Sequence, residues 1–200
     1  MTNGYPELVA AISSEITRNG PIPFVRFMEL ALYHPQFGYY MRQSDGVEHE
    51  RIGWSGDFYT SSDVHPILGR AIAGQVRQMD EVMDCPAPFT IVEMGAGKGL
   101  LARDCLAAIH EDQDDFASRV RYVLIERSLV MRNLQRQNLA PWLRTPGLVT
   151  WIDSLDGLGP QGVTGLFLSN ELIDAFPVHR VQVKDGRTEE LYVDYRDGRF

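Results

Sequence analysis

One stretch constrains the fold of this chain more than any other, residues 89–99, which read Phe-Thr-Ile-Val-Glu-Met-Gly-Ala-Gly-Lys-Gly. A short apolar strand is followed by glycines at alternate positions, and a helix is predicted from residue 100 to about 110. Glycine permits positive φ in a tight turn and leaves room for a ligand against bare main chain. The first amides of the helix face the same ligand. The pattern therefore predicts a strand–turn–helix unit that binds a nucleoside-bearing cofactor.

The spacing of the glycines narrows the choice of cofactor. The dinucleotide fingerprint is G-x-G-x-x-G, whereas Gly99 comes one residue early. A P-loop needs Ser or Thr after its lysine, but Lys98 is followed by glycine. An acid two residues before G-x-G-x-G resembles motif I of class I S-adenosylmethionine (SAM) methyltransferases. The residues expected to bind SAM here are Glu93, Gly95, Ala96, Gly97 and Gly99, with Glu93 at the cationic end of SAM, directly or through water. A purely structural glycine-rich turn is the alternative.

Two further acids follow apolar strands. Residues 121–126 end in Glu126, and an acid at that place typically accepts both ribose hydroxyls of a bound nucleoside. Residues 148–152 lead into Asp153, where SAM enzymes often place the residue that contacts the adenine amino group. The alternative for Glu126 is a solvated side chain that begins the next helix.

Composition limits the partners. Acids outnumber bases 27 to 19, which gives a formal net charge of −8 and disfavours duplex nucleic acid while suiting a cationic substrate. The two cysteines and five histidines show no metal or redox spacing, so we expect no metal and a reducing compartment. No apolar run approaches the ~20 residues of a membrane span. We expect a cytoplasmic protein if the source is bacterial and a mitochondrial one if it is eukaryotic, and the lack of a basic leader favours the former.

Strands and helices alternate along the second half, which predicts an α/β doubly wound sheet, Rossmann-like, with an N-terminal helical extension. Residues 165–169 are all apolar, as in a central parallel strand, and alternating residues flank Asp185-Gly186, a hairpin signal. We expect a helical and lid region over residues 1–85 and the SAM-binding domain over residues 86–200. The expected helices are 6–19, about 23–33, 63–83 (with Asp63 as N-cap), 100–110 and 128–138, and the expected strands are 89–93, 121–126, 148–152 and 165–169.

Three longer stretches point to one family. They are residues 22–40, 56–69 and 169–178, the last reading Ser-Asn-Glu-Leu-Ile-Asp-Ala-Phe-Pro-Val. With the glycine motif they resemble the MidA family of SAM-dependent methyltransferases, over about residues 5–200. Members of that family usually carry Ser-Pro-Glu where this chain has Ser61-Ser62-Asp63, which keeps the acid and loses the proline.

The resemblance implies SAM as cofactor and a protein arginine as methyl acceptor, which in mitochondrial members lies on a core subunit of respiratory complex I. A guanidinium needs carboxylates to orient it, and Glu171 and Asp174 follow the fourth strand, at the edge where open α/β sheets bind ligands. If residues 170–174 turn helically, both acids share one face. The alternative is that Asn170 caps a helix whose N-terminus the acids merely favour. The candidate catalytic residues are Glu171, Asp174 and Asn170.

Asp57, Phe58 and Thr60 lie in the long aromatic segment before the predicted helix at residue 63. Loops of this length are more often functional than idle. We therefore expect these three residues to form a lid over cofactor and substrate, with Asp57 and Thr60 among the cofactor-binding residues.

Two other functions stay open. One is a nicotinamide-dinucleotide oxidoreductase, which the early third glycine disfavours, and the other is a non-catalytic assembly factor that keeps a SAM fold for protein contact alone. The chain ends just after the hairpin, whereas a full methyltransferase sheet has seven strands, so we expect the C-terminal strands to be absent. An unpaired apolar edge after the fourth strand would then favour self-association, with a dimer as one outcome.

Overall fold

The computed structural model describes residues 4–42, 56–57, 59–112 and 114–200. The chain forms two compact units, one made by Met1–Gln43 with Ile173–Phe200 and the other by Ser44–Leu172. This division differs from the one expected at residue 85, because the helix before that residue packs in the larger unit. Within the described ranges, no helix is both long enough and apolar enough to cross a membrane.

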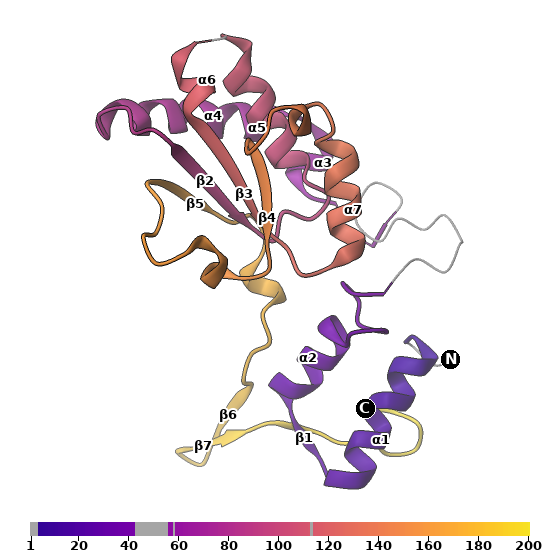
Figure 1. The fold of residues 1–200 in the computed structure, drawn as a ribbon. Helices are drawn as coiled ribbons and strands as arrows, with labels where there is room; N and C mark the ends of the chain where they lie inside the picture. Colours follow the sequence, from indigo (N-terminus) through magenta and orange to yellow (C-terminus); the bar gives the residue numbers. More distant parts are fainter. Residues whose placement is uncertain (1–3, 43–55, 58, 113) are drawn as a thin grey trace. The chain divides into compact units, whose positions relative to one another are not determined.

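A four-stranded parallel sheet forms the centre of the larger unit (Figure 1). Its strands are β2 (Phe89–Met94), β3 (Val120–Ile125), β4 (Val149–Ile152) and β5 (Gly165–Leu168). They run in the order β4-β3-β2-β5, with every neighbouring pair parallel. All four strands were predicted to within one residue of these bounds, and the parallel order confirms the α/β class. In the described part of the chain β5 lies at the edge of the sheet, which agrees with the expected apolar edge after the fourth strand.

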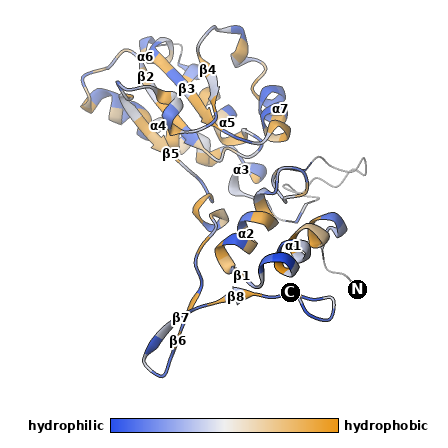
Figure 2. Cartoon of the chain, turned by 60° about the horizontal axis from the view of Figure 1, so that its bottom comes forward, coloured by the Kyte–Doolittle hydropathy of each residue, from blue (hydrophilic) through white to orange (hydrophobic). Residues whose placement is uncertain are grey.

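Helices cover the sheet and bury its core. Cys105, Leu106 and Ile109 of the helix after the glycine turn are fully buried against Ile91 and Tyr122 of the sheet. The hydrophobic residues are concentrated on the strands of the sheet, as the colouring of the cartoon shows (Figure 2). The helices are α3 (Ser61–Val64), α4 (Ile67–Val82), α5 (Leu100–Glu111), α6 (Asp115–Arg119) and α7 (Leu129–Asn138), with 3₁₀ turns at Trp142–Arg144 and Leu155–Leu158.

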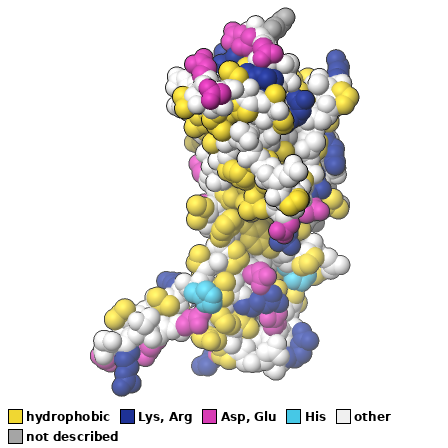
Figure 3. Space-filling model, turned by 60° about the vertical axis from the view of Figure 1, so that its left-hand side comes forward, with side chains coloured by type: hydrophobic (Ala, Val, Ile, Leu, Met, Phe, Trp, Pro, Cys, Tyr) yellow, Lys and Arg dark blue, Asp and Glu magenta, His cyan; other side chains and the backbone are white. Residues whose placement is uncertain are grey.

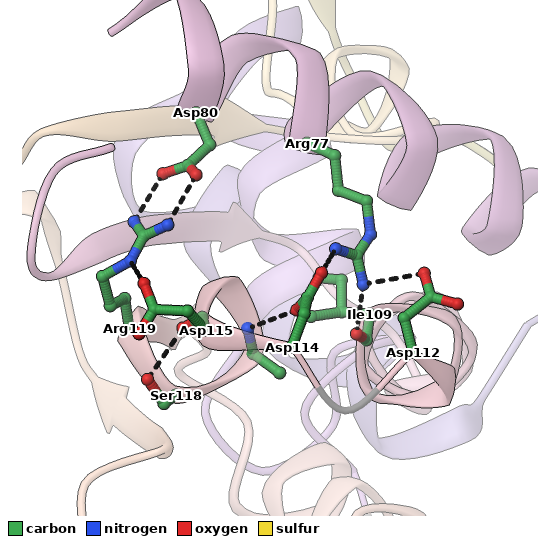
Figure 4. A network of polar contacts seen from close by, with 9 residues as sticks. Arg77, Asp80, Ile109, Asp112, Asp114, Asp115, Ser118 and Arg119 are labelled. Atoms are coloured by element: carbon green, nitrogen blue, oxygen red, sulfur yellow. Dashed lines mark hydrogen bonds and ion pairs between the residues drawn. The ribbon is translucent and has the colours of Figure 1, made fainter. Parts of the chain in front are cut away.

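An ionic network joins α4, α5 and α6 at the end of the sheet opposite the glycine turn (Figure 4). The Arg119 guanidinium donates to both carboxylate oxygens of Asp80, at 2.7 and 2.8 Å, and also pairs with Asp115. Arg77 pairs with Asp114, whose other oxygen accepts the Ala117 amide at 3.2 Å and so caps α6. Helix α6 could not be predicted from the sequence, because the hydrophobic periodicity of a helix is not recognisable over five residues.

The smaller unit joins the two ends of the chain. Strand β1 (Ile22–Pro23) pairs antiparallel with β8 (Tyr192–Val193), and Ile12, Ile16 and Leu30 form a separate apolar core with Ile22. The other elements are helices α1 (Pro6–Asn19) and α2 (Phe24–Tyr33), a 3₁₀ turn (Ile173–Ala175), and strands β6 (Val181–Lys184) and β7 (Arg187–Glu190).

The predicted hairpin at Asp185-Gly186 is present, since β6 and β7 pair across these two residues, both of which have positive φ (51° and 74°). This is the two-residue turn that Asp-Gly favours. Strand β8 follows this hairpin as a separate strand, paired with β1 and not with β6.

Candidate functional site

The glycine turn after β2 has the geometry that the sequence predicts. Gly95 and Gly97 have φ values of 74° and 53°, in the left-handed region that favours glycine, and Gly99 forms the N-cap of α5. A Cβ at Gly97 would meet no atom within 4 Å, so the space beside this residue is open. A Cβ at Gly95 would lie 2.5 Å from Leu172 Cδ1. The turn therefore presents bare main chain at Gly97 and is packed from the β5 side at Gly95.

Helix α7 holds this turn through two amide side chains. Gln135 is completely buried, and its Nε2 donates to the Gly97 carbonyl at 2.8 Å. The Asn138 side chain donates to the Lys98 carbonyl at 3.0 Å. Sequence reasoning missed both residues, because nothing in Leu-Gln-Arg-Gln-Asn separates a buried glutamine from exposed neighbours.

Glu126 follows β3 directly and lies beside the turn. Its carboxylate accepts the Ser128 amide at 2.8 Å on one oxygen and Gln135 Nε2 at 3.2 Å on the other. Burial raises the pKa of Glu126, while these two hydrogen bonds oppose the rise. Gln135 therefore connects Glu126 to the glycine turn, and it also accepts the Trp151 indole N–H at 2.8 Å. Each oxygen of Glu126 keeps a lone pair for a ligand hydroxyl.

Asp153 follows β4, in the next strand position along the sheet. Its Oδ1 pairs with Arg132 at 2.5 Å, and 87% of its side chain is exposed. Arg132 also donates to the carbonyls of Glu126 and Ile152, at 2.7 and 3.0 Å. Arg132 thus fixes the ends of both strands, and the exposed carboxylate of Asp153 is available to an amino group.

Glu93 differs from the other acids, because its side chain is enclosed. It is 2% exposed, and its Oε2 accepts the Tyr122 hydroxyl at 2.6 Å. Burial raises the pKa of Glu93 to about 7, and the hydrogen bond from Tyr122 only partly opposes this. Burial likewise raises the pKa of Cys105, which lies close by, to about 12. The direct contact of Glu93 with a SAM amino group stays a prediction, since the structure shows this carboxylate bound to a tyrosine.

The segment at α3 meets the turn from another side. Asp63 forms a capping box with Thr60, accepting its amide at 2.9 Å and its hydroxyl at 3.0 Å. The prediction that Asp63 caps the long helix was wrong, because that acid caps α3 from its third position and α4 begins separately at Ile67. The Lys98 ammonium lies 2.5 Å from Asp63 Oδ1. Of the expected lid residues, Asp57 is exposed and Thr60 half-buried, whereas Phe58 lies outside the described residues.

Ser62 is the other residue of α3 that sequence reasoning missed. It is 9% exposed, and its hydroxyl has no hydrogen-bond partner among the residues that the structure describes. Buried hydroxyls are nearly always hydrogen-bonded in proteins, so this hydroxyl is a candidate for a contact with a ligand. The signal available in the sequence was its place in the 56–69 motif.

The segment after β5 does not form the helical turn considered for residues 170–174. Glu171 has a φ of 49°, and only Ile173–Ala175 is helical, as a 3₁₀ turn. Asn170 therefore caps no helix, and Glu171 and Asp174 share no helical face. Glu171 is exposed and belongs to the larger unit, where its neighbour Leu172 packs against Gly95. Asp174 belongs to the smaller unit. Burial raises the pKa of Tyr40 in that unit, and the charge of Asp174 raises it further.

Comparison with known proteins decides the family. The sequence model of a family described as putative S-adenosyl-L-methionine-dependent methyltransferases matches residues 68–200. The chain belongs to this family. The match covers the whole parallel sheet and the glycine turn, and it agrees with the α/β class and with SAM as the family's cofactor.

Relatives of this chain include the mitochondrial protein arginine methyltransferase NDUFAF7 homolog of Drosophila melanogaster. The two sequences are 30% identical over a match that covers 96% of this chain and 46% of the relative. The human protein arginine methyltransferase NDUFAF7 is 25% identical over 96% of the chain and 46% of its own length. A crystal structure from Burkholderia thailandensis, bound to S-adenosyl-homocysteine, matches with a TM-score of 0.77 and 29% identity over 97% of the chain and 48% of that protein. The chain thus spans about half the length of the relatives it matches.

The residues of the site fit SAM. The open main chain at Gly97, the oxygens of Glu126 and the exposed carboxylate of Asp153 follow three neighbouring strands at one edge of the sheet. Ligands of open α/β sheets bind at this edge. The Ser62 hydroxyl, which has no hydrogen-bond partner among the described residues, adds a donor.

Proposed function

We propose that this chain forms the cofactor-binding half of a SAM-dependent protein-arginine methyltransferase. The relatives named protein arginine methyltransferases support the reaction, and the net charge of −8 suits a cationic acceptor. By its resemblance to the MidA family, the acceptor protein is a subunit of respiratory complex I.

Two observations carry the proposal: the glycine turn leaves open space at Gly97 beside Glu126, and the fold matches that of a protein crystallised with S-adenosyl-homocysteine. The two features are independent, because one concerns this chain's own main chain and the other a whole-fold comparison.

Each residue of the site has a role that follows from its chemistry. Glu126 accepts hydrogen bonds from the ribose hydroxyls, and Asp153 accepts one from an amino group of the base. The bare main chain at Gly97 lets the cofactor approach closely. Gln135 donates hydrogen bonds to both Glu126 and the Gly97 carbonyl, and so fixes the position of the carboxylate relative to the turn. When bound, SAM supplies a methyl group on a positively charged sulfur. The chain must align the acceptor nitrogen with that methyl, and alignment provides much of the rate in such a displacement.

The acceptor guanidinium is placed by Glu171 in this proposal. This acid is exposed and its neighbour Leu172 packs on the glycine turn, so it lies next to the cofactor segment within one compact unit. A carboxylate binds a guanidinium through paired charge-assisted hydrogen bonds, which fix its plane. Asp174 and Asn170 are retained as candidate partners of the substrate.

Calorimetric titration tests the cofactor assignment. We expect the purified protein to bind S-adenosyl-homocysteine with micromolar affinity and NADH not at all. Binding of NADH instead would revive the dinucleotide alternative. Absence of binding by folded protein, judged from its circular dichroism, would contradict a complete cofactor site within these 200 residues.

A further inference from the structure

A nearly buried ion pair joins α3 to the glycine turn. The Lys98 ammonium lies 2.5 Å from Asp63 Oδ1, and the two side chains are 13% and 4% exposed. Asp63 Oδ1 has no other partner among the described residues. Burial by itself raises the pKa of Asp63, but Lys98 and the hydrogen bonds from Thr60 outweigh it and lower that pKa, so the acid is charged at neutral pH.

The two partners come from segments that sequence alone does not connect. Lys98 lies between the second and third glycines of the turn. Asp63 lies 35 positions earlier, in a four-residue helix. The other oxygen of Asp63 holds Thr60, so one carboxylate orders the start of α3 and attaches it to the turn. The same helix carries the buried Ser62 hydroxyl, which lacks a partner among the described residues.

We infer that the Asp63–Lys98 pair positions α3 on the glycine turn and thereby completes the cofactor site, to which α3 contributes the Ser62 hydroxyl. Both are positioning residues, because neither needs to touch the cofactor. This inference rests on the proposed SAM site. A chain that samples the assembled site only part of the time binds its ligand more weakly by that fraction.

The same arrangement accounts for the acid in the 56–69 motif. Where members of the resembled family carry Ser-Pro-Glu, this chain carries Ser61-Ser62-Asp63. A glutamate is one methylene longer than an aspartate and keeps the negative charge, so we expect a glutamate at this position to pair with Lys98 as Asp63 does.

The test separates charge from capping. Asp63→Asn keeps an oxygen for the Thr60 amide but removes the charge, Lys98→Met removes the ammonium but keeps the length of the side chain, and the double variant leaves no unpaired charge. Asp63→Glu is the conservative rescue. The matched control is Glu111→Gln, which removes the exposed ion pair with Arg70 at the far end of α5.

Two quantities are measured for each variant: the Kd for S-adenosyl-homocysteine by calorimetry, and hydrogen–deuterium exchange of the amides of residues 59–64 and 95–99 in the ligand-free protein. We expect Asp63→Asn, Lys98→Met and the double variant to raise Kd about tenfold, as when the competent fraction falls to about one tenth. Exchange should quicken in both segments. Asp63→Glu should stay within about threefold of the wild type, and Glu111→Gln should match it.

The outcomes separate this inference from the proposed function. Unchanged exchange in the folded double variant would overturn the pair as a positioning device, whatever the affinity. Faster exchange with an unchanged Kd would overturn its role in cofactor binding. Wild-type protein that does not bind S-adenosyl-homocysteine would overturn the proposed function and, with it, the cofactor role of the pair, while the exchange data would still decide whether the pair joins the two segments.

Discussion

Glu171 adopts a backbone conformation that residues with a side chain rarely take. Its φ of 49° lies in the left-handed region, which costs roughly 1–2 kcal/mol for a residue other than glycine. Strained residues of this kind concentrate where function requires a side chain at a fixed place. At the scale of single residues, this conformation supports the proposal that Glu171 places the acceptor guanidinium.

Replacing Glu171 with glutamine should therefore remove arginine methylation and leave cofactor binding intact. Loss of the charge that orients the guanidinium is expected to lower kcat by about 10²-fold or more, while the Kd for S-adenosyl-homocysteine stays within a few-fold. Glu171→Gly should be at least as stable to heat as the wild type, since it relieves the strain, and equally inactive. Glu81→Gln, an exposed acid on α4, is the control. Retained methylation in Glu171→Gln would remove this residue from the mechanism.

Glu93 makes stability depend on pH near neutrality. Its pKa is raised from 4.5 to about 7 in the folded chain, so between these values the folded state holds a proton that the unfolded state has lost. Folding stability from this group is thus complete below pH 4.5, falls as the pH rises toward 7 and is constant above it. At about 1.4 kcal/mol per unit of pKa difference, the loss is on the order of 3–4 kcal/mol.

The matched variant is Glu93→Gln, which cannot ionise but keeps an oxygen for the Tyr122 hydroxyl. Urea unfolding of both ligand-free proteins at pH 5, 6.5 and 8 measures the difference in free energy of unfolding. We expect the wild type to lose stability relative to Glu93→Gln across this range. Parallel pH profiles for the two proteins would show that Glu93 has an ordinary pKa.

At the scale of elements, the periodic segments could be predicted from the sequence, and the short ones could not. Helices α1 and α5 and all four sheet strands carry clear patterns, and the Asp-Gly turn fixed the β6–β7 hairpin. The pairing of β1 with β8 depends on residues 170 positions apart, which no local pattern encodes. The same limit applies to the site. The glycines and Glu126 can be recognised from their spacing in the sequence. Gln135, Ser62 and the pairing of Asp63 with Lys98 are evident only from how the folded chain packs.

The network around α6 shows how a short helix is stabilised from outside. The Asp80 side chain is 5% exposed, and its carboxylate accepts hydrogen bonds from both terminal nitrogens, Nη1 and Nη2, of the Arg119 guanidinium. Arg119→Met should lower the free energy of unfolding by about 3–5 kcal/mol, because it leaves a buried carboxylate without its partner. The double variant Asp80→Asn with Arg119→Met should recover part of this loss. Asp115→Asn removes only the exposed arm, worth about 1 kcal/mol or less. Equal losses for Arg119→Met and Asp115→Asn, measured by urea unfolding, would contradict this assignment.

At the scale of the whole molecule, the described sheet ends at β5 with an apolar surface. Phe167 pairs in register with Val92 of β2 on one side only, and it is 57% exposed. Figure 3, turned toward the side where β5 lies in Figure 1, shows hydrophobic side chains gathered on this face of the larger unit. An edge strand with unpaired main-chain groups and an exposed aromatic residue is a surface on which further chain associates.

We therefore expect the purified 200-residue chain to self-associate through β5, with an apparent mass in sedimentation velocity that rises with protein concentration. Phe167→Lys places a charge on the edge strand and should shift the distribution toward the 22.6 kDa monomer at the same concentration. Val183→Lys, which changes an exposed apolar residue of the β6–β7 hairpin, is the matched control and should leave the distribution unchanged. Since Phe167 lies within β5, level with Val92 and before the glycine turn, both variants should bind S-adenosyl-homocysteine as the wild type does. A wild-type chain that stays monomeric at every concentration would show that this edge is already satisfied within one molecule.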